Sequence, residues 1–598
     1  MTASASLELK PMEKRFRYLA SQLWRVAIVA SLLPIVVDPG SPSALAAADV
    51  DAEYRDPNEP GDGMQVVILN DRVLGPGQAF SFLMGPSDRP GRYGPLCASL
   101  AEASCSGEKT VSYKAVLQSC SQSSQLDCIS GFGSATESND RTPGSFLGTF
   151  PTRGRHDFTG DVSKKLPSGG AATLWSLPSQ PHRGGTTYMV QVVVSGDKAV
   201  RSDTFSSNSN FVIEITPVEI VGDEGTQCDL DPATGVLEEC GEDQGPGYYV
   251  TQIVDGEPVT GIAARPSSSE FDCILVAQKQ CARRHPFPSD ARLYLTVRLS
   301  QSPTGWLHGR VSKPLVAVNS LGGTAVEIDV AANSVKTPVI AVARPWAQLP
   351  EPLREAYRAT GGYNGEQAGT RNRAQFESGP EIRNAISGPS AYSTTGMAEL
   401  LAWLPYIGDK STADISRWML RSMSDEELAG ASSCFANRSQ LNGLLMTNAT
   451  QYSAGPPTFD RAAGSLEYKV AAPHYTSGGS TFLGTYDLVM RSTVARCLYG
   501  FTNAPLNVSI SVVDNDGSNS VATKVVSERD GWLRIAAYGF GFSAPTIKVQ
   551  MTQEQPPVAK PSNTTTVKRT TITCRKGKTI RKVTAIKPSC PKGWKQRP

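Results

Sequence analysis

The residues of this chain with the clearest chemistry are its twelve cysteines, which fall into neighbouring pairs along the sequence. Three pairs share one spacing, with seven residues between the two thiols. The full set is Cys97 with Cys105, Cys120 with Cys128, Cys228 with Cys240, Cys273 with Cys281, Cys434 with Cys497, and Cys574 with Cys590. An even number of cysteines in such pairs is typical of disulfide-stapled proteins that fold outside the cytosol. We therefore expect each cysteine to be bonded to its neighbour, in an oxidising compartment.

The second chemical feature is a basic tail. Residues 559–598 contain twelve Lys or Arg and no Asp or Glu, whereas residues 48–558 carry 41 basic and 53 acidic side chains. Segments 570–574 and 579–586 predict a hairpin that turns at Lys576-Gly577-Lys578, with Cys590 folded back onto Cys574, because so small a unit needs a covalent staple. Its charge would attract polyanions such as wall polymers or acidic lipid head groups, and the alternative is a merely solubilising end. The candidate polyanion-binding residues are Arg575, Lys576, Lys578, Arg581, Lys582, Lys587, Lys592 and Lys595.

Patterns for catalysis or cofactor binding are missing from the sequence. It has no Gly-x-Ser-x-Gly elbow, no His-Glu-x-x-His and no phosphate-binding loop, so we predict no catalytic, cofactor-binding or metal-binding residue. His308 and His474 each lie beside an aromatic residue in strand-like sequence, where a hydrogen-bonded structural histidine is the commoner case. Residues 514–517 (DNDG) resemble the start of a calcium loop, but Val525 occupies the position that needs a glutamate, which favours a hairpin turn.

The N-terminus has the features of an export signal. Basic residues precede an apolar stretch at 26–37, and Ala44-Leu45-Ala46 offers a small-x-small cleavage site. A membrane-spanning helix needs roughly 20 apolar residues, so this stretch favours a cleaved signal peptide over an uncleaved anchor. We expect a mature chain without a transmembrane segment, either secreted or held at the cell surface.

Composition predicts a mainly β fold of tandem antiparallel β-sandwich-like domains, with a helical segment before the last large domain and a disulfide-stapled basic hairpin at the C-terminus. Gly (54) and Pro (42) are abundant, and short β-branched runs alternate with turn residues. The expected boundaries are 1–46 signal peptide, 47–63 flexible lead-in, 64–215 β domain with short cystine loops, 216–345 second β domain, 346–430 helical or irregular segment, 431–553 β domain, 554–566 linker and 567–598 basic disulfide hairpin.

The helical segment is expected from the spacing of its apolar residues. Residues 397–404 and 413–423 place leucine, tryptophan, isoleucine and methionine at intervals of three and four. Ser424 and Glu427 have the spacing of a capping box, which predicts a further helix start.

Several phrases of the sequence resemble large secreted proteins of actinobacteria that have no established activity. The tail segments 571–578 (TITCRKGK), 582–584 (KVT) and 587–594 (KPSCPKGW) resemble a C-terminal motif of such exported proteins, with Trp594 where tyrosine is more usual. Segments 455–459 (GPPTF), 484–491 (GTYDLVMR) and 495–501 (ARCLYGF) resemble the domain before it. The resemblance implies export and a cell-surface or extracellular setting, and it brings no catalytic residues.

These observations together favour an exported, non-enzymatic structural or adhesive protein whose basic tail contacts anionic envelope polymers or glycans, with no cofactor and no nucleic-acid partner. The alternative is an extracellular glycan-binding protein or a polysaccharide or wall hydrolase. Sandwich domains can bind sugars through exposed aromatic rings, and Trp175, Trp306 and Trp532 are the candidates. Exposed rings beside two carboxylates would favour the alternative, and buried rings would favour a scaffold.

Overall fold

The computed structural model describes residues 64–69, 80–87, 94–107, 109–152, 156–222, 248–254, 257–263, 273–277, 280–345, 351–352, 354, 385–387, 394–424, 427–429, 431–435, 440–453, 455–501, 506–513, 523–542, 546–553 and 568–598. The predicted signal peptide, lead-in and 554–566 linker lie outside this part of the chain, and so do residues 514–517.

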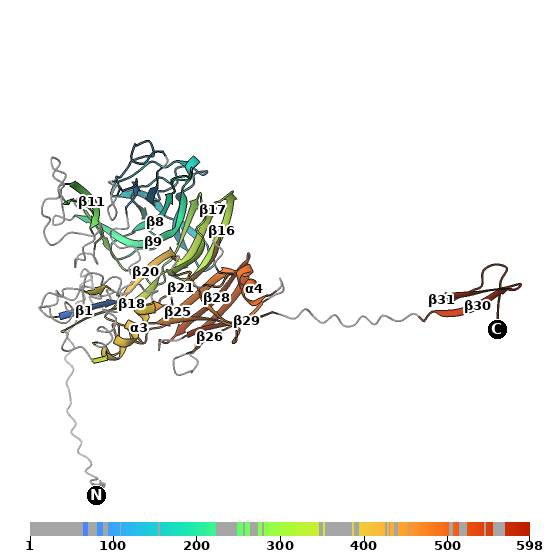
Figure 1. Ribbon diagram of the computed structural model, residues 1–598. Coiled ribbons are helices and arrows are strands. Elements are labelled where there is room, and N and C mark those ends of the chain that lie inside the picture. Colours follow the sequence, from blue (N-terminus) through green and yellow to red (C-terminus); the bar gives the residue numbers. More distant parts are fainter. Residues whose placement is uncertain are drawn as a thin grey trace, which may run out of the picture. The chain divides into compact units, whose positions relative to one another are not determined.

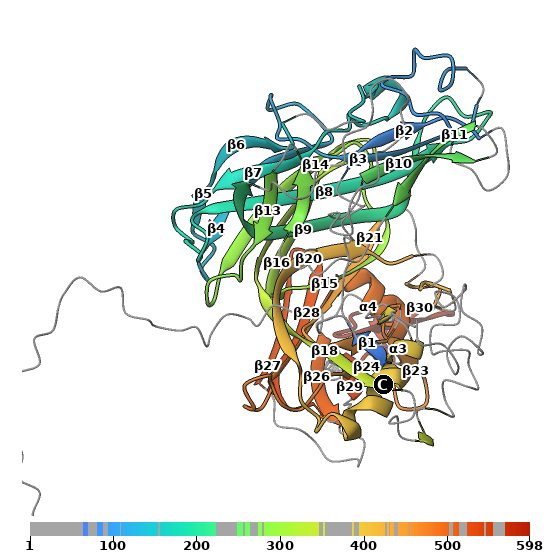
Figure 2. The ribbon, with the colours of Figure 1, turned by 90° about the vertical axis from the view of Figure 1, so that its left-hand side faces the viewer.

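The fold is mainly β, as the composition predicts, and it is built around one large sheet (Figures 1 and 2). Its strands pair in the succession β6 (Ser145–Phe150), β7 (Ala172–Ser176), β8 (Thr187–Lys198), β9 (Ser206–Gly222), β20 (Ala413–Ser422), β15 (Gly305–Arg310), β21 (Leu441–Thr447), β25 (Gly484–Arg491), β28 (Trp532–Phe540) and β27 (Thr523–Arg529). Neighbouring strands are antiparallel except β15 and β21, which are parallel.

Shorter strands extend this sheet at several places. They are β3 (Val111–Val116) on β8, β2 (Phe82–Met84) on β3, β13 (Gln280–Arg284) on β9, β12 (Cys273–Ala277) on β13, β18 (Val335–Pro345) on β20, and β1 (Met64–Leu69) between β18 and β19 (Ala385–Ser387). A separate hairpin joins β10 (Tyr248–Val254) to β11 (Glu257–Ala263). A 3-10 turn spans η2 (Val162–Lys164).

Two further sheets pack on the large sheet and give the sandwich-like layers. One has the order β16 (Ser312–Gly322), β17 (Ala325–Asn333), β14 (Arg292–Leu299), β4 (Cys128–Ala135), β5 (Arg141–Pro143). The other has the order β22 (Gln451–Tyr452), β24 (Ser465–Ala471), β29 (Thr546–Gln553), β26 (Leu506–Val513), with β23 (Thr458–Asp460) also on β24.

The large sheet contributes side chains to both hydrophobic cores. In β21, Leu444 and Met446 belong to the core shared with β14 and β17, while Leu445 belongs to the core shared with β24 and β29. Successive side chains of a strand point to opposite faces, so a strand between two cores is apolar on both. This layering explains why all seven residues of β21 are buried.

The strands also connect segments that composition alone assigns to separate domains. The expected boundary at 215/216 falls inside β9, which runs without a break from Ser206 to Gly222. β1, from the first expected domain, pairs with β18, from the second, and β18 pairs with β20.

One of the two predicted helices is present and the other is wrong. Helix α3 (Thr394–Trp403), followed by the 3-10 turn η5 (Leu404–Tyr406), covers the expected helix at 397–404. Residues 413–422 form strand β20 instead. Trp418 is buried on one face of the sheet, and Ile415 and Met419 are buried on the other. A strand that is buried on both faces loses the period-two pattern that would distinguish it from a helix.

The capping box at Ser424 forms its expected bonds. The Ser424 amide donates to Glu427 Oε2 at 2.6 Å and the Glu427 amide donates to Ser424 Oγ at 3.2 Å. Residues 427–429 form a turn rather than a continuing helix, so the box here fixes a single turn.

Disulfides join four of the predicted pairs. They are Cys97–Cys105, Cys120–Cys128, Cys434–Cys497 and Cys574–Cys590. Cys281 is also disulfide-bonded. Among the cysteines that the structure describes, none is a free thiol.

The predicted bonds Cys273–Cys281 and Cys228–Cys240 are not among the four that the structure describes. Cys228 lies outside the described residues, and Cys240 does too, because both fall between β9 and β10 in the range 223–247. Their pairing therefore stays a prediction from the sequence.

Candidate functional site

The basic tail folds as a small three-stranded sheet. β30 (Thr570–Lys576) pairs with β31 (Thr579–Ala585) on one side and β32 (Lys595–Gln596) on the other. The two-residue loop has Gly577 at its first central position with a φ of 60°, where a type II′ hairpin turn requires glycine. The Cys574–Cys590 disulfide closes the unit, and Cys574 is fully buried. The predicted hairpin and its staple are therefore confirmed.

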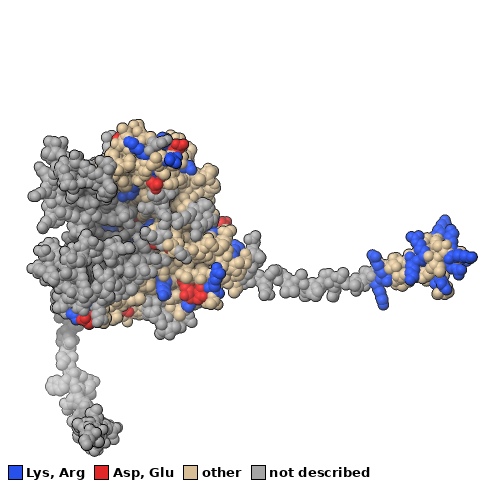
Figure 3. All heavy atoms as spheres, in the orientation of Figure 1, with Lys and Arg blue, Asp and Glu red and all other residues tan. Residues whose placement is uncertain are grey.

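Cations cover both faces of this hairpin. Directly paired residues lie on the same face of a sheet. Arg575 pairs with Lys595, so these two cations share one face. Lys582 pairs with Thr573, which lies on that same face, so Lys582 is a third cation there. Lys576 lies on the other face, as does Arg581, which pairs with Cys574. All eight predicted polyanion-binding residues are exposed. The space-filling view shows the blue Lys and Arg atoms spread over the hairpin (Figure 3).

The charge on the hairpin has no internal counterpart. Residues 568–598 contain eleven Lys or Arg and no Asp or Glu, and Arg575 lies directly opposite Lys595. Like charges placed directly opposite each other destabilise an antiparallel pair. The strand ladder and the disulfide hold the cations together against this repulsion, so an external polyanion would relieve it. This makes the hairpin a candidate anion-binding site.

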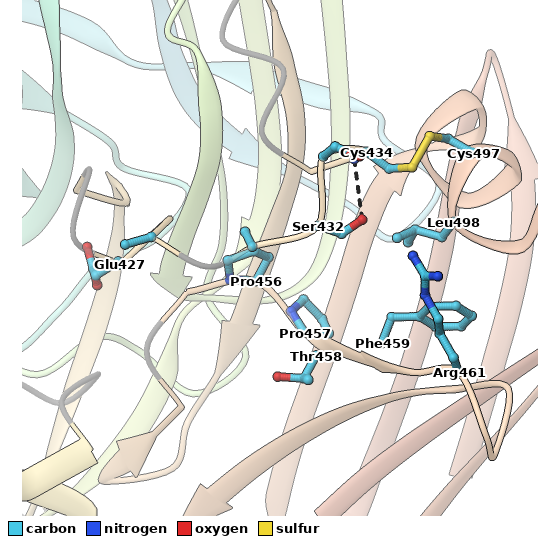
Figure 4. A pocket seen from close by; sticks show the side chains of 13 residues that line it. Glu427, Ser432, Cys434, Pro456, Pro457, Thr458, Phe459, Arg461, Cys497 and Leu498 are labelled. Carbon is cyan, nitrogen blue, oxygen red and sulfur yellow. Dashed lines mark hydrogen bonds between the residues drawn. A yellow bond between two sulfur atoms is a disulfide. The ribbon is translucent and has the colours of Figure 1, made fainter.

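A second candidate site is a pocket of about 410 Å³ in the C-terminal part of the body, the name used here for residues 64–553. Three segments far apart in sequence line it, at 427–434, 456–461 and 497–498. The last segment belongs to helix α4 (Ser492–Tyr499), which the Cys434–Cys497 disulfide ties to the first. Figure 4 shows this disulfide near Leu498, with Pro456, Pro457 and Phe459 along the pocket.

The pocket lining offers little for catalysis. Glu427 is the one carboxylate among the lining residues, and both of its oxygens accept from Arg421 Nη2, at 2.9 and 3.0 Å. Arg461 is the one cation of the lining, and it is exposed. The Phe459 ring packs against Tyr499, with 4.8 Å between centroids. A pair of carboxylates for glycoside cleavage is not supplied by this lining.

Glu427 also belongs to a buried polar cluster around His308. The His308 Nδ1 lies 2.5 Å from the Tyr452 hydroxyl, and Nε2 lies 3.6 Å from Glu427 Oε1. Burial lowers the pKa of His308 well below its usual range, and the neighbouring Arg421 and Arg310 lower it further. Burial raises the pKa of Glu427, against the opposing effect of Arg421.

A second buried polar cluster surrounds Asp487 in β25. Asp487 Oδ1 accepts from Arg534 Nη2 at 3.0 Å and from the Tyr538 hydroxyl at 2.5 Å. Asp487 Oδ2 accepts from the backbone amide of Lys313 in β16 at 3.1 Å, which ties two sheets together. Burial raises the pKa of Asp487, and Arg534 acts in the opposite direction. No local pattern in the sequence indicates this cluster, because Lys313 and Asp487 are 174 residues apart.

The three tryptophans considered as sugar platforms are all buried. Trp175 lies in the core shared with β14 and β17, and Trp306 lies in the core shared with β24 and β29. The Arg491 guanidinium covers Trp532, with 4.7 Å between its carbon and the ring centroid. These three candidate rings therefore pack inside the protein and are not exposed as sugar-binding platforms.

The two histidines singled out in the sequence both have structural environments. His474 is held by hydrogen bonds, since its amide donates to Asp409 Oδ1 and its Nδ1 lies 2.9 Å from the Phe542 carbonyl oxygen. His308 is enclosed in the cluster with Tyr452 and Glu427.

The part of the chain that the structure describes holds no cluster of three side chains suited to a metal ion. Over the same residues, no helix has the length and apolar character needed to cross a bilayer.

Comparison of the chain with known protein families and with curated proteins finds no match in either.

Proposed function

We propose that this chain is an exported, non-enzymatic structural or adhesive protein of the cell surface, and that its C-terminal hairpin binds anionic polymers of the envelope. The observation that carries the proposal is the hairpin itself, in which eleven Lys or Arg and no Asp or Glu are held in a disulfide-closed sheet. A polymer of regularly spaced anions can contact cations on both faces at once, and attraction of this kind increases with the number of charges.

Two further observations support the proposal. The paired cysteines are typical of an oxidising compartment outside the cytosol. The burial of Trp175, Trp306 and Trp532 favours a scaffold over a sugar-binding or sugar-cleaving surface. The signal peptide predicted from the sequence and the resemblance to secreted actinobacterial proteins agree with this assignment.

The test is binding of the purified full chain to isolated actinobacterial envelopes and to a soluble polyglycerol-phosphate polymer, across a salt series. The triple variant Arg575→Gln, Lys582→Gln, Lys595→Gln removes three exposed cations of the hairpin. We expect it to weaken binding by about tenfold or more at low salt, and we expect the salt dependence of the wild type to be steeper.

The matched control neutralises three exposed cations of the body, at Lys164, Arg201 and Lys410. It removes the same formal charge from the chain, so its binding should stay close to that of the wild type. Equal loss of binding in both variants would contradict a hairpin-specific site, as would retention that does not change with salt.

A further inference from the structure

Strand β16 forms one edge of its five-stranded sheet and is open to solvent along most of its length. Among the described strands it pairs only with β17, over Ser312 to Gly322 (Figure 1). Its residues from Leu315 to Gly322 carry no charge. Leu315 and Leu321 remain 38% and 44% exposed. An exposed, uncharged and apolar edge is a template for pairing with another strand.

Two other edge strands of the molecule carry features that block such pairing, whereas β6 and β26, which are also edge strands, contain no charged residue and no proline. β27, the edge strand beyond β28, contains Lys524, Glu528 and Arg529. β5, the opposite edge of the same five-stranded sheet, is three residues long and contains Arg141 and Pro143. Charges, prolines and short length are the usual protection of an edge. From Leu315 onward β16 has no charged residue and no proline, and its length of eleven residues is sufficient for a new ladder. Its register with β17 is irregular between Ser320 and Gly322.

The sequence of β16 is complementary to itself in one antiparallel register. We propose that two copies of this chain pair edge to edge through β16, about a two-fold axis at Val318. In this register Leu315 lies opposite Leu321 of the second copy, and Ala317 lies opposite Asn319. Leu315 and Leu321 are exposed in the single chain, so the pairing covers four exposed leucines in total. Directly opposed apolar side chains stabilise an antiparallel pair.

Charge does not oppose this register. The cation nearest to the interface is Lys313, which lies opposite Gly323 of the second copy in the proposed pairing. Its Nζ already contacts Glu137 Oε1 at 2.8 Å within its own chain. No like charges therefore meet across the two-fold axis.

The expected association is weak. Stable protein interfaces bury roughly 1,200–2,000 Å², and a single pair of strand edges provides less than this. We therefore expect a dimer that forms with increasing concentration, and the proposal does not depend on what the basic hairpin binds.

Sedimentation velocity of the full chain over a concentration series tests the proposal. The single variant Leu321→Lys places a cation against the apolar Leu315 of the second copy, and we expect the dissociation constant to rise about tenfold or more. The matched control Leu147→Lys makes the same change at an exposed leucine on another edge strand, β6, and it should dimerise like the wild type.

The double variant Leu315→Glu, Leu321→Lys tests the register itself. It places opposite charges across the proposed two-fold axis, so dimerisation should recover relative to Leu321→Lys alone. A wild type that stays monomeric at every concentration would overturn the proposal. Loss of the dimer in the Leu147→Lys variant would also overturn it. So would a double variant that dimerises no better than Leu321→Lys alone. Circular dichroism of each variant verifies that the fold is intact.

Discussion

At the scale of single residues, the polar and ionisable groups that matter most for stability are those that the sheets cover. His308 and Asp487 are both fully buried, and each is held by an arginine or tyrosine from a strand distant in sequence. A buried polar or charged group is costly to leave without its partner. These residues therefore hold the layers in one arrangement, and substitutions at them should act on stability rather than on binding.

His308 should make stability depend on pH. Its pKa in the folded chain is far below that of an unfolded histidine, about 6.5. The contribution of His308 to the free energy of unfolding is complete above the pKa of the unfolded histidine. It is lost as the pH falls below it, because only the unfolded chain then binds the proton. The loss should approach about 1.4 kcal/mol for each pH unit.

Urea unfolding of wild type and His308→Gln at pH 7.5, 6.5 and 5.5 measures this effect. The wild type should lose stability more steeply than the variant over this range. Parallel curves would show that His308 makes no such contribution.

Asp487→Asn should be strongly destabilising, because Arg534 would lose its buried counter-ion. Breaking a pair of this kind costs about 3 kcal/mol or more. The control is Asp530→Asn, whose partner Arg529 is as exposed as Asp530 itself, and it should leave the midpoint of urea unfolding unchanged. A similar midpoint for the two variants would contradict the structural role of the Asp487 cluster.

At the scale of elements, the parallel contact of β15 with β21 depends on a glycine. Trp306 lies beside Gly443 in the register, and a Cβ at Gly443 would meet the tryptophan ring at 2.4 Å. We expect Gly443→Ala to destabilise the protein by about 1–3 kcal/mol, since the core has no room to accept the methyl group.

Gly222→Ala is the matched control for this prediction, because a Cβ there would meet no atom within 4 Å. Urea unfolding compares the two variants. Equal stability would mean that the Trp306 ring yields to the added methyl group.

The sequence predicts elements well where one local signal dominates. The hairpin of β30 and β31 follows from Gly577 and the paired cysteines. β20 could not be recognised, because Trp418 and Met419 point into different cores and no alternation remains.

The pocket is a different case, since its lining residues come from three separate segments. The Cys434–Cys497 pair is the one feature of the sequence that connects two of them. The pocket exists only once β23, α4 and the capping-box turn lie together, which no local pattern specifies.

At the scale of the whole molecule, the basic hairpin and the body have different sources of stability. The body has two large cores, whereas the described residues of the hairpin include one fully buried side chain, Cys574, and a disulfide that spans 16 residues. Closing a loop of that length contributes about 3 kcal/mol in the chain-entropy model. The hairpin should therefore depend on its disulfide far more than the body does.

The double variant Cys574→Ser, Cys590→Ser should abolish the slow amide exchange of β30 and β31, and it should weaken polyanion binding. The melting temperature of the body should remain that of the wild type. Hydrogen exchange with mass spectrometry and a thermal scan measure the two effects. Persistent protection in the hairpin of this variant would show that the strand ladder is sufficient without the disulfide.

Strand β9 has a practical consequence for anyone who divides this chain. It pairs with β8, β13 and β20, so it joins residues from three separate stretches of the sequence, 187–222, 280–284 and 413–422. A fragment that stops at residue 215 would lack both β20 and β13, and it would expose apolar side chains of β9 such as Ile213 and Ile215 to solvent. Calorimetry of residues 64–553 should accordingly give one cooperative melting transition, and the region is better expressed whole than as separate modules.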